Sequence, residues 1–361
     1  GGDRAVVTFH LDNGIYASEA QFIEDIKTCQ ARGQKVNISL GGQNGIISVT
    51  SAADKVKFVN SVIGIIEKYG FDGLDIDFEG TSAGGYSPAF DQPNQQAQYM
   101  IDAIREICDH FGDNFILTMA PETAYVQFGY MSSLAPAYMT LIHGLRDKLT
   151  CLHVQLYNTG NSSALDGKNY NPGTPDYLVA MCDMLLQGFP NSGKTFPALA
   201  ESQVAIGVPT CTGAAGSGIV SVEDMAKALN YLLTGNKPAG MTYTLAKPGG
   251  YPNFRGLMTW SVNYDHGKIN YNLANTISKL YDDFDGNPLE NCGEVVADEE
   301  APSTPTNLTA NPSENSVVLS WTASTDNVAV RGYNIYKNGS KVGSTNKTTF
   351  TVSDLTASTE I

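Results

Sequence analysis

A chain of 361 residues, of which 42% are hydrophobic, is long enough to bury a large core and to add one small domain. Its formal net charge of −15 argues against nucleic acid or an anionic membrane as the main partner, so a neutral or cationic substrate fits better. No stretch approaches the roughly 20 apolar residues of a membrane span, and no signal peptide is recognisable, so we expect a soluble chain.

Six cysteines are scattered without the paired C-x-x-C spacing that marks a zinc site or a redox motif. We therefore predict no metal, and no cofactor motif is found. Cys108 and Cys151 fall at apolar positions of a predicted helix and a predicted strand, where buried free thiols are common. Disulfides remain open. The cysteines are Cys29, Cys108, Cys151, Cys182, Cys211 and Cys292.

From about residue 18 the sequence repeats one unit, which is a capped helix, a Gly-containing turn and a short apolar strand. The first helix is predicted to begin at Ser18, with Gln21 completing a capping box, and the second to run from near Ser51 to Gly70. The later helices are predicted to end at Gly112, to cover 138–149, to begin at Thr174 and at Ser221, and to cover 273–284. Strands are predicted near residues 35, 73, 115, 151, 204 and 256, and residues 6–11 (VVTFHL) are a candidate seventh.

Strands rich in Val, Ile and Leu that alternate with helices indicate a parallel sheet covered by helices. The alternative is an open doubly wound sheet, but the G-x-G-x-x-G that usually accompanies it is missing. Polar residues cluster at the C-terminal end of nearly every strand, which favours a TIM (β/α)8 barrel. Because a barrel needs eight strands and seven at most are found, we expect the first one or two strands to be missing.

The composition changes after the last predicted helix, so we assign residues 1–286 to the barrel. Residues 287–304 are acidic and then rich in Pro and Thr, which predicts a linker. In residues 305–361 the stretches SVVLSW, YNIYKNG and TFTV alternate in the manner of strands between turn residues. They predict a partial all-β sandwich of the fibronectin type III kind, which we expect to be a spacer without chemistry of its own.

The stretch DGLDIDFE, residues 72–79, carries three acids on one face of a predicted strand, namely Asp75, Asp77 and Glu79. Its aliphatic side chains must meet the helices, so the acids face the barrel interior and Glu79 lies at the rim, where barrel enzymes place catalytic groups. A solvated surface strand is the plain alternative. No basic residue lies within the strand to pair with the acids, and like charges this close oppose joint ionisation. We therefore interpret the row as a catalytic site, with Asp72 ordering the entry of the strand.

The DGLDIDFE stretch resembles the signature of glycoside hydrolase family 18, the chitinases and their relatives. Further motifs of that family stand in the right order, and the similarity covers nearly all of residues 15–284. They are SLGG (39–42), MAPE (119–122), QLYN (155–158) and GLMTWSVNYD (256–265). Residues 210–255 are too few for the extra α+β insertion of some relatives, so the resemblance is to the bacterial type with a shallower, open groove.

The resemblance implies a retaining mechanism in which the substrate assists, an exception to the usual pair of carboxylates. Glu79 would protonate the glycosidic oxygen while the 2-acetamido oxygen of the substrate attacks the anomeric carbon and forms an oxazolinium ion. Asp77 would orient the acetamido N–H, Asp75 would share a proton with it, and Ser39 would anchor this pair. Tyr157 would donate its hydroxyl to the acetamido oxygen.

Several further residues are predicted to contact the sugar. Trp260 offers a flat apolar surface to a pyranose ring. Its position alone leaves a core tryptophan equally open, and the surrounding TWSVNYD match favours the sugar floor. Gln155 should point the same way as Tyr157, two residues further on. We add Met119, Glu122 and Asn158, although methionine is more often core packing and Glu122 is also compatible with a solvated loop.

The sequence thus predicts a secreted, monomeric endochitinase that binds chitin or N-acetylglucosamine oligosaccharides and neither nucleic acid nor membrane. One alternative keeps the chemistry and changes the substrate, as in endo-β-N-acetylglucosaminidases that act on N-glycans. A second is a chitin-binding, lectin-like barrel, which typically loses the acid that Glu79 supplies here. A third is a truncated barrel without activity.

Overall fold

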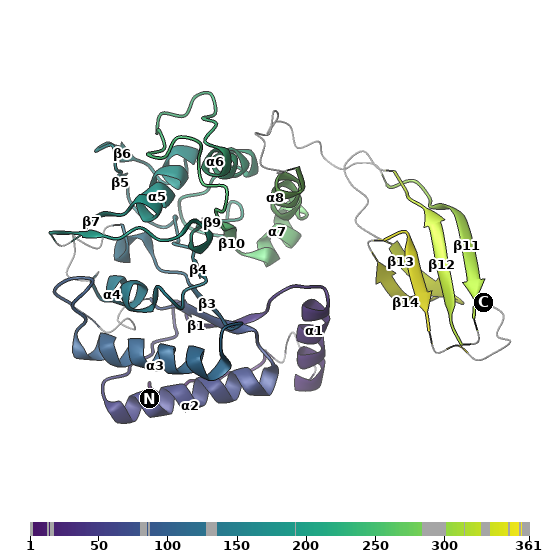
Figure 1. The fold of residues 1–361 in the computed structure, drawn as a ribbon, viewed down its shortest axis with the longest axis horizontal. Helices are drawn as coiled ribbons and strands as arrows, with labels where there is room; N and C mark the ends of the chain where they lie inside the picture. Colours follow the sequence, from purple (N-terminus) through teal and green to yellow (C-terminus); the bar gives the residue numbers. More distant parts are fainter. Residues whose placement is uncertain are drawn as a thin grey trace. The chain divides into compact units, whose positions relative to one another are not determined.

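The chain comprises two compact units, residues 1–293 and residues 294–361 (Figure 1). The structure is a computed structural model. It describes residues 3–12, 14, 18–79, 85, 87–127, 136–191, 193–283, 301–313, 315–325, 333–345, 347–353 and 355.

Six parallel strands form the sheet of the first unit, within the residues that the structure describes. β1 pairs with β2, β2 with β3, β3 with β4 and β9 with β10, while bridges from Leu152 to Val204 and from Gln155 to Gly207 connect the β4 segment to β9. The strands are β1 (Asn37–Gly41), β2 (Gly73–Asp77), β3 (Ile116–Met119), β4 (Cys151–Leu152), β9 (Ala205–Pro209) and β10 (Gly256–Trp260). All six coincide with predicted strands. Their spatial order follows the chain, as in a barrel, whereas a doubly wound sheet reverses direction at a central strand.

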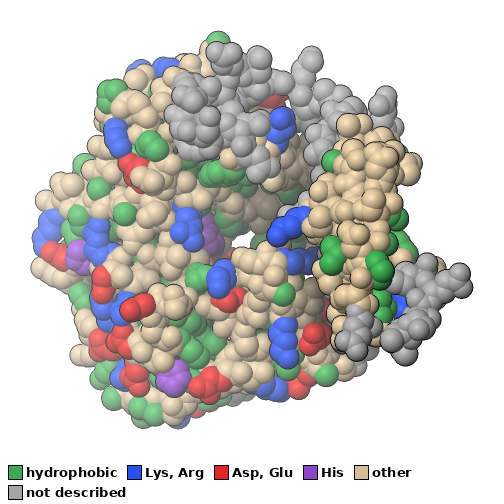
Figure 2. Space-filling view, turned by 45° about the vertical axis from the view of Figure 1, so that its right-hand side comes forward, with side chains coloured by type: hydrophobic (Ala, Val, Ile, Leu, Met, Phe, Trp, Pro, Cys, Tyr) green, Lys and Arg blue, Asp and Glu red, His purple; other side chains and the backbone are tan. Residues whose placement is uncertain are grey.

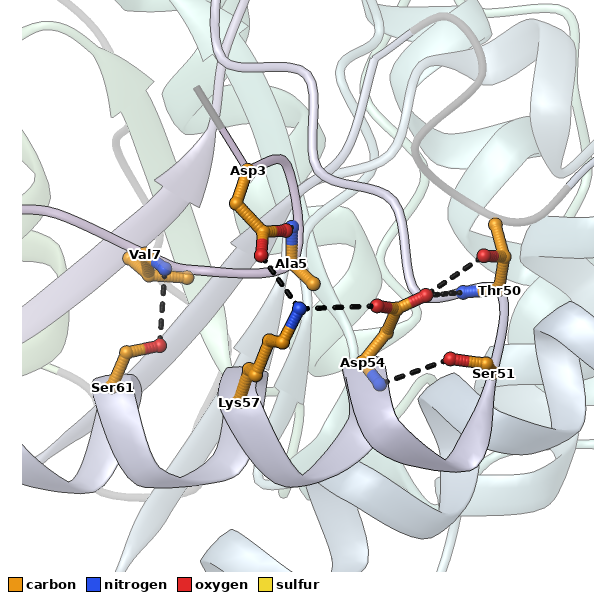
Figure 3. Close-up of polar contacts among 8 residues, drawn as sticks. All are labelled: Asp3, Ala5, Val7, Thr50, Ser51, Asp54, Lys57 and Ser61. Carbon is orange, nitrogen blue, oxygen red and sulfur yellow. Dashed lines mark hydrogen bonds and ion pairs between the residues drawn. The ribbon is translucent and has the colours of Figure 1, made fainter.

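The prediction of a seventh strand at residues 6–11 was wrong. Among the described residues this segment pairs with no strand, and it instead lies along α2 (Ala52–Tyr69) (Figure 3). The N–H of Val7 donates to Ser61 Oγ at 3.0 Å, and Lys57 Nζ lies 2.7 Å from Asp3 Oδ2. Further along, the ring of Phe9 packs among Phe22, Tyr69 and Phe71. The alternating apolar residues of this segment therefore serve helix and ring packing rather than a sheet.

The helices between the strands begin where capping side chains were predicted. Ser18, Ser51, Thr174 and Ser221 each accept a hydrogen bond from the backbone N–H three residues later. The helices are α1 (Glu19–Ala31), α2, α3 (Gln95–Phe111), α4 (Pro136–Leu145), α5 (Pro175–Gln187), α6 (Val222–Thr234), α7 (Val262–Ile269) and α8 (Asn272–Asp283). α4 ends four residues before the predicted end because residues 146–148 form a turn, and α7 was not predicted. Two short hairpins, β5 (Ser162–Ser163) with β6 (Asn169–Tyr170) and β7 (Phe189–Asn191) with β8 (Lys194–Phe196), were also not predicted.

The core lies between the helices and the outer face of the sheet. Leu74, Ile76 and Phe78 are at most 1% exposed and meet the apolar side chains of the surrounding helices. Burial of one such side chain contributes roughly 1.5–3 kcal/mol, so the outer face of β2 is a main source of stability. The opposite face of the same strand therefore remains for polar side chains.

Residues 210–255, all of them described, contain α6 and loops without a further sheet, in agreement with the predicted absence of an α+β insertion. Buried Asp183 on α5 fixes part of this segment. Its Oδ2 accepts from the Tyr243 hydroxyl at 2.7 Å and from the Ala246 N–H at 2.8 Å. Because a buried carboxylate is costly unless it is hydrogen-bonded, these contacts specify the path of the loop.

The second unit is a small antiparallel β structure, and the three predicted strand segments are confirmed in it. Its sheets have the orders β11-β12-β15 and β13-β14. The strands are β11 (Thr306–Pro312), β12 (Val317–Thr322), β13 (Tyr333–Lys337), β14 (Ser340–Thr345) and β15 (Thr349–Val352). A small core holds them together, in which the ring of Trp321 packs edge-on against Tyr333.

Three further observations concern the surface charge, the cysteines and the helices. On the face shown in Figure 2, acidic and basic side chains are interspersed rather than gathered by sign. Cys29, Cys108, Cys151, Cys182 and Cys211 are free thiols, and Cys108 and Cys151 are buried, as expected; Cys292 lies outside the described residues. Within the part of the chain that is described, no helix combines the length and the apolar character that a membrane span requires.

Candidate active site

Asp75 and Asp77 of β2, together with Glu79 two residues beyond its end, occupy the inner face of the sheet. Asp75 is registered with Ser39 on β1 and with Thr118 on β3, and all three side chains meet. Asp77 and Glu79 follow at intervals of two residues and are partly exposed, so the row runs from the interior of the sheet to its C-terminal rim. The prediction of an outer aliphatic face and an inner acidic face is therefore correct for this strand.

Asp75 is surrounded by donors. Ser39 Oγ donates to its Oδ2 at 2.7 Å, and Thr118 Oγ1 donates to its Oδ1 at 2.5 Å. The Nε2 atom of His153 lies 3.4 Å from the same Oδ1. Burial alone opposes ionisation of Asp75, but the His153, Thr118 and Ser39 donors outweigh it and hold the pKa of Asp75 below its ordinary value.

Asp77 has the opposite electrostatic situation. Burial, followed by the charges of Glu79 and Asp75, raises the pKa of Asp77 to about 7. His153 and Gln155 lower this pKa, but they offset only part of the rise. Two carboxylates this close do not ionise together readily. With Asp75 stabilised as the anion, Asp77 is the member of the pair that binds a proton more readily.

The segment that continues β4 brings two predicted residues to these acids. Gln155 Nε2 donates to Asp77 Oδ1 at 3.0 Å and to the carbonyl of Ala120 at 2.9 Å, which fixes the amide group. Tyr157 is largely buried. Burial first, and then the charges of Asp77, Glu79 and Glu122, raise the pKa of Tyr157 above its ordinary value, so its hydroxyl stays protonated and can donate.

Glu122 is brought to the same end of the sheet, where its backbone bridges that of Gln155. Its side chain is partly buried rather than fully solvated. Burial, followed by the charge of Glu79, raises the pKa of Glu122. A carboxyl group of this kind near Glu79 is available as a hydrogen-bond partner.

Asn158 has a structural task in this site. Its Oδ1 accepts from the N–H groups of Gly216 and Ser217 at 2.9 and 3.1 Å, so it ties a neighbouring loop to the segment that continues β4. Gly218 of that loop, at φ +82°, approaches so closely that a Cβ there would lie 2.7 Å from the Cα of Tyr157. The loop therefore supports the backbone of Tyr157, and the Oδ1 of Asn158 is already engaged.

Trp260 stands at the C-terminal end of β10 and is 54% exposed, which contradicts the alternative of a core tryptophan. It is registered with Pro209, two residues from Gly207, which in turn bridges Gln155. Registered residues of parallel strands share a face, so the indole belongs to the inner face that carries Gln155. Thr210 holds this end of the strand, since its N–H donates to the carbonyl of Trp260 at 3.0 Å.

Met119 is not brought to the acids. Its partner in β2 is Ile76, which lies on the outer face, and Met119 is fully buried. We therefore correct its assignment from substrate contact to core packing. Asp72 lies at the opposite end of β2, where it accepts from the N–H of Val36 at 2.9 Å and from Gln30 Nε2 at 2.9 Å. It connects β1, β2 and α1 away from the reacting groups.

Sequence reasoning missed Thr118, His153 and Tyr138. The alternation of CLHVQLYN places His153 on the same face as Gln155 and Tyr157, so the sequence could have predicted that His153 lies in the site. Thr118 can be assigned to the site only when the register between β2 and β3 is known. The hydroxyl of Tyr138 donates to the carbonyl of Ile76 at 2.7 Å from α4, and no sequence pattern announces this contact.

The end of β1 depends on a glycine. Gly41 has φ +116°, and a Cβ there would lie 2.1 Å from the carbonyl oxygen of Asp77, the atom to which Gly42 N–H donates at 2.7 Å. We expect Gly41→Ala to lower the melting temperature and to reduce the activity proposed below at least tenfold, because β1 must move away from Asp77. Gly64→Ala, in the middle of α2 with open space around it, is the matched control. Equal melting temperatures of the two variants would contradict this account.

Comparison with known proteins identifies the family. The family described as Glycosyl hydrolases family 18 matches residues 5–240, and the Fibronectin type III domain matches residues 303–360. The chain therefore belongs to glycoside hydrolase family 18, with a fibronectin type III domain in its C-terminal part. Its parallel strands are those of the TIM-type barrel of this family.

Individual relatives agree with this. The chain is 47% identical over 257 residues to Chitinase Chi52 of Paenibacillus xylanexedens and 46% identical over 258 residues to Chitinase D of Niallia circulans, covering 69% of this chain and 49% of each relative. It thus spans about half the length of these curated relatives. A solved family 18 chitinase from Chromobacterium violaceum has a TM-score of 0.70 and 37% identity, covering 78% of this chain and 73% of that chain.

Proposed function

We propose that this chain is a chitinase that cuts β-1,4-linked N-acetylglucosamine polymers internally, with retention and with assistance from the substrate. The observation that carries the proposal is the unequal treatment of two neighbouring carboxyls. Three donors stabilise the anion of Asp75, whereas the pKa of Asp77 is raised to about 7. One member of the row is thereby prepared as an anion and the next as a proton carrier.

Each group then has a defined task. Glu79, at the rim, protonates the leaving glycosidic oxygen and afterwards takes a proton from water. The 2-acetamido oxygen of the bound sugar attacks the anomeric carbon, so the positive charge develops on the acetamido group. Asp77 turns toward the acetamido N–H and, on passing its proton to Asp75, provides a negative charge beside the oxazolinium ion. The hydroxyl of Tyr157 donates to the acetamido oxygen and aligns it for attack.

The binding contacts follow the same face. The exposed indole of Trp260 forms the floor for a pyranose ring. Gln155 keeps Asp77 in place, and Glu122 accepts a hydrogen bond from a sugar hydroxyl. The described segment 210–255 adds no walls from an α+β insertion, which supports a shallow groove open to internal cutting. We expect the protein to act as a secreted monomer, with chitin oligosaccharides as its partners.

The deciding experiment uses a chitin hexamer and a glycoprotein that carries N-glycans. We expect hydrolysis of internal linkages of the hexamer and release of the β-anomer. Chromatography of the products detects the position of the cut, and NMR of fresh products detects the anomer. Release of glycans with an intact hexamer would favour the endo-β-N-acetylglucosaminidase alternative. Binding of the hexamer without hydrolysis would favour the lectin alternative.

A further inference from the structure

His153 contacts the innermost acid of the site, and none of the roles given above requires it. Its Nε2 lies 3.4 Å from Asp75 Oδ1, and the two side chains are 14% and 15% exposed. Within the described residues, no other basic side chain lies within ion-pairing distance of any of the three acids. Water screens a contact at this depth less than a surface pair.

The tautomer of the ring follows from its other nitrogen. Nδ1 of His153 is buried, and no described residue offers it a hydrogen-bond partner. A proton on Nδ1 would be a buried donor without an acceptor, which costs free energy. The neutral ring therefore carries its proton on Nε2 and directs it to Asp75.

The donors of the two inner carboxyls are unequal in number. Among the described residues, Asp75 receives side-chain contacts from Ser39, Thr118 and His153, whereas Asp77 receives one, from Gln155. Ser39 and Thr118 donate neutral hydroxyl groups. The Nε2–H group of the imidazole directs its positive end at Asp75, and among the three donors His153 lowers the pKa of Asp75 most.

We propose that His153 is a positioning residue of this site, which keeps the negative charge on Asp75 and thereby leaves the shared proton on Asp77. The inference rests on the proposed function and adds a residue to it. His153 touches neither the sugar nor the reacting bond and acts through Asp75. The lowered pKa of Asp75 and the raised pKa of Asp77 are in accord with this arrangement.

Other titratable groups face the same acids from every side and enter the pH dependence. They are Asp77 on β2, Glu79 just beyond its end, Tyr138 on α4, Glu122 after β3, Cys151 on β4 and Tyr157 in the segment that continues it. The substitutions below leave all of them unchanged.

The test compares three substitutions in the full chain with chitin hexamer as substrate. His153→Leu removes the donor, and we expect kcat to fall about tenfold and the acid limb of the kcat profile to move up by about one pH unit, because Asp75 then binds its proton more readily. KM should change less than about twofold. His153→Gln restores an N–H donor and should return most of kcat. His143→Gln is the control, since that ring also has a buried, unpartnered Nδ1 but lies against Phe90 and Phe196.

A double-mutant cycle separates positioning from simple packing. In the Asp75→Asn background, the added His153→Leu substitution should cost less than about twofold in kcat, because no carboxylate charge remains to be held. Additive losses, or an unchanged pH profile in His153→Leu, would overturn the proposal while hexamer cleavage by the unchanged protein still supports the chitinase. If the unchanged protein does not cleave the hexamer, imidazole ¹⁵N NMR decides, since Asp75→Asn must shift the Nε2 signal of His153. An unmoved signal rejects the contact.

Discussion

Glu79→Gln is expected to lower kcat for a chitin hexamer by about 10³-fold, because the amide has no proton to give to the leaving oxygen. Glu79 is the outermost of the three acids and is partly exposed at the rim, where a glycosidic oxygen can reach it. Binding of the hexamer should be retained, since the amide has nearly the shape of the acid. Turnover is measured with a fluorescent substrate or from the reducing ends released, and binding is measured by calorimetry.

The matched control for this variant is Glu106→Gln. Glu106 is an exposed glutamate on α3 that pairs with Lys55 at 2.7 Å, away from the site. A surface pair of this kind contributes little, so kcat should remain within about twofold of the unchanged protein. Equal turnover of Glu79→Gln and Glu106→Gln would refute Glu79 as the acid.

Asp77→Asn is expected to lower kcat by about 10²- to 10³-fold with a smaller change in KM. The amide can still contact the acetamido group, but it supplies no negative charge when positive charge develops on the substrate. Steady-state kinetics on the hexamer checks this split between kcat and KM. A variant whose loss lies in KM alone would show that Asp77 only binds substrate.

The same substitution has a pH-dependent effect on stability. The pKa of Asp77 is raised from 3.8 to about 7 in the folded chain, so its contribution to stability is fully present below about pH 4 and is lost as the pH rises toward 7. Asn carries no charge to lose. Asp77→Asn should therefore melt at about 2 °C above the unchanged protein at pH 8, allowing for solvent screening, and at an equal temperature at pH 4. A lower melting temperature at pH 8 would contradict the burial argument.

Local patterns accounted for most of the fold. The capping residues at Ser18 and Ser51 act on the backbone three residues away, so the sequence contains both partners. The early end of α4 and the path of residues 6–11 were not predicted, because the contacts that decide them are not local in the sequence. Val7 and Phe9 are held by α2 and by an aromatic cluster far along the chain, and alternation alone does not distinguish this from a strand.

The sequence by itself determined the acidic row of β2, because a period of two places Asp75, Asp77 and Glu79 on one face whatever surrounds them. Only the tertiary structure decided which side chains of other strands join that row. Register placed Thr118 beside Asp75 and turned Met119 to the outer face, and it brought His153 to the innermost acid. Contacts between strands depend on how far each strand slides against the next, and residues of a single strand carry no information on that distance.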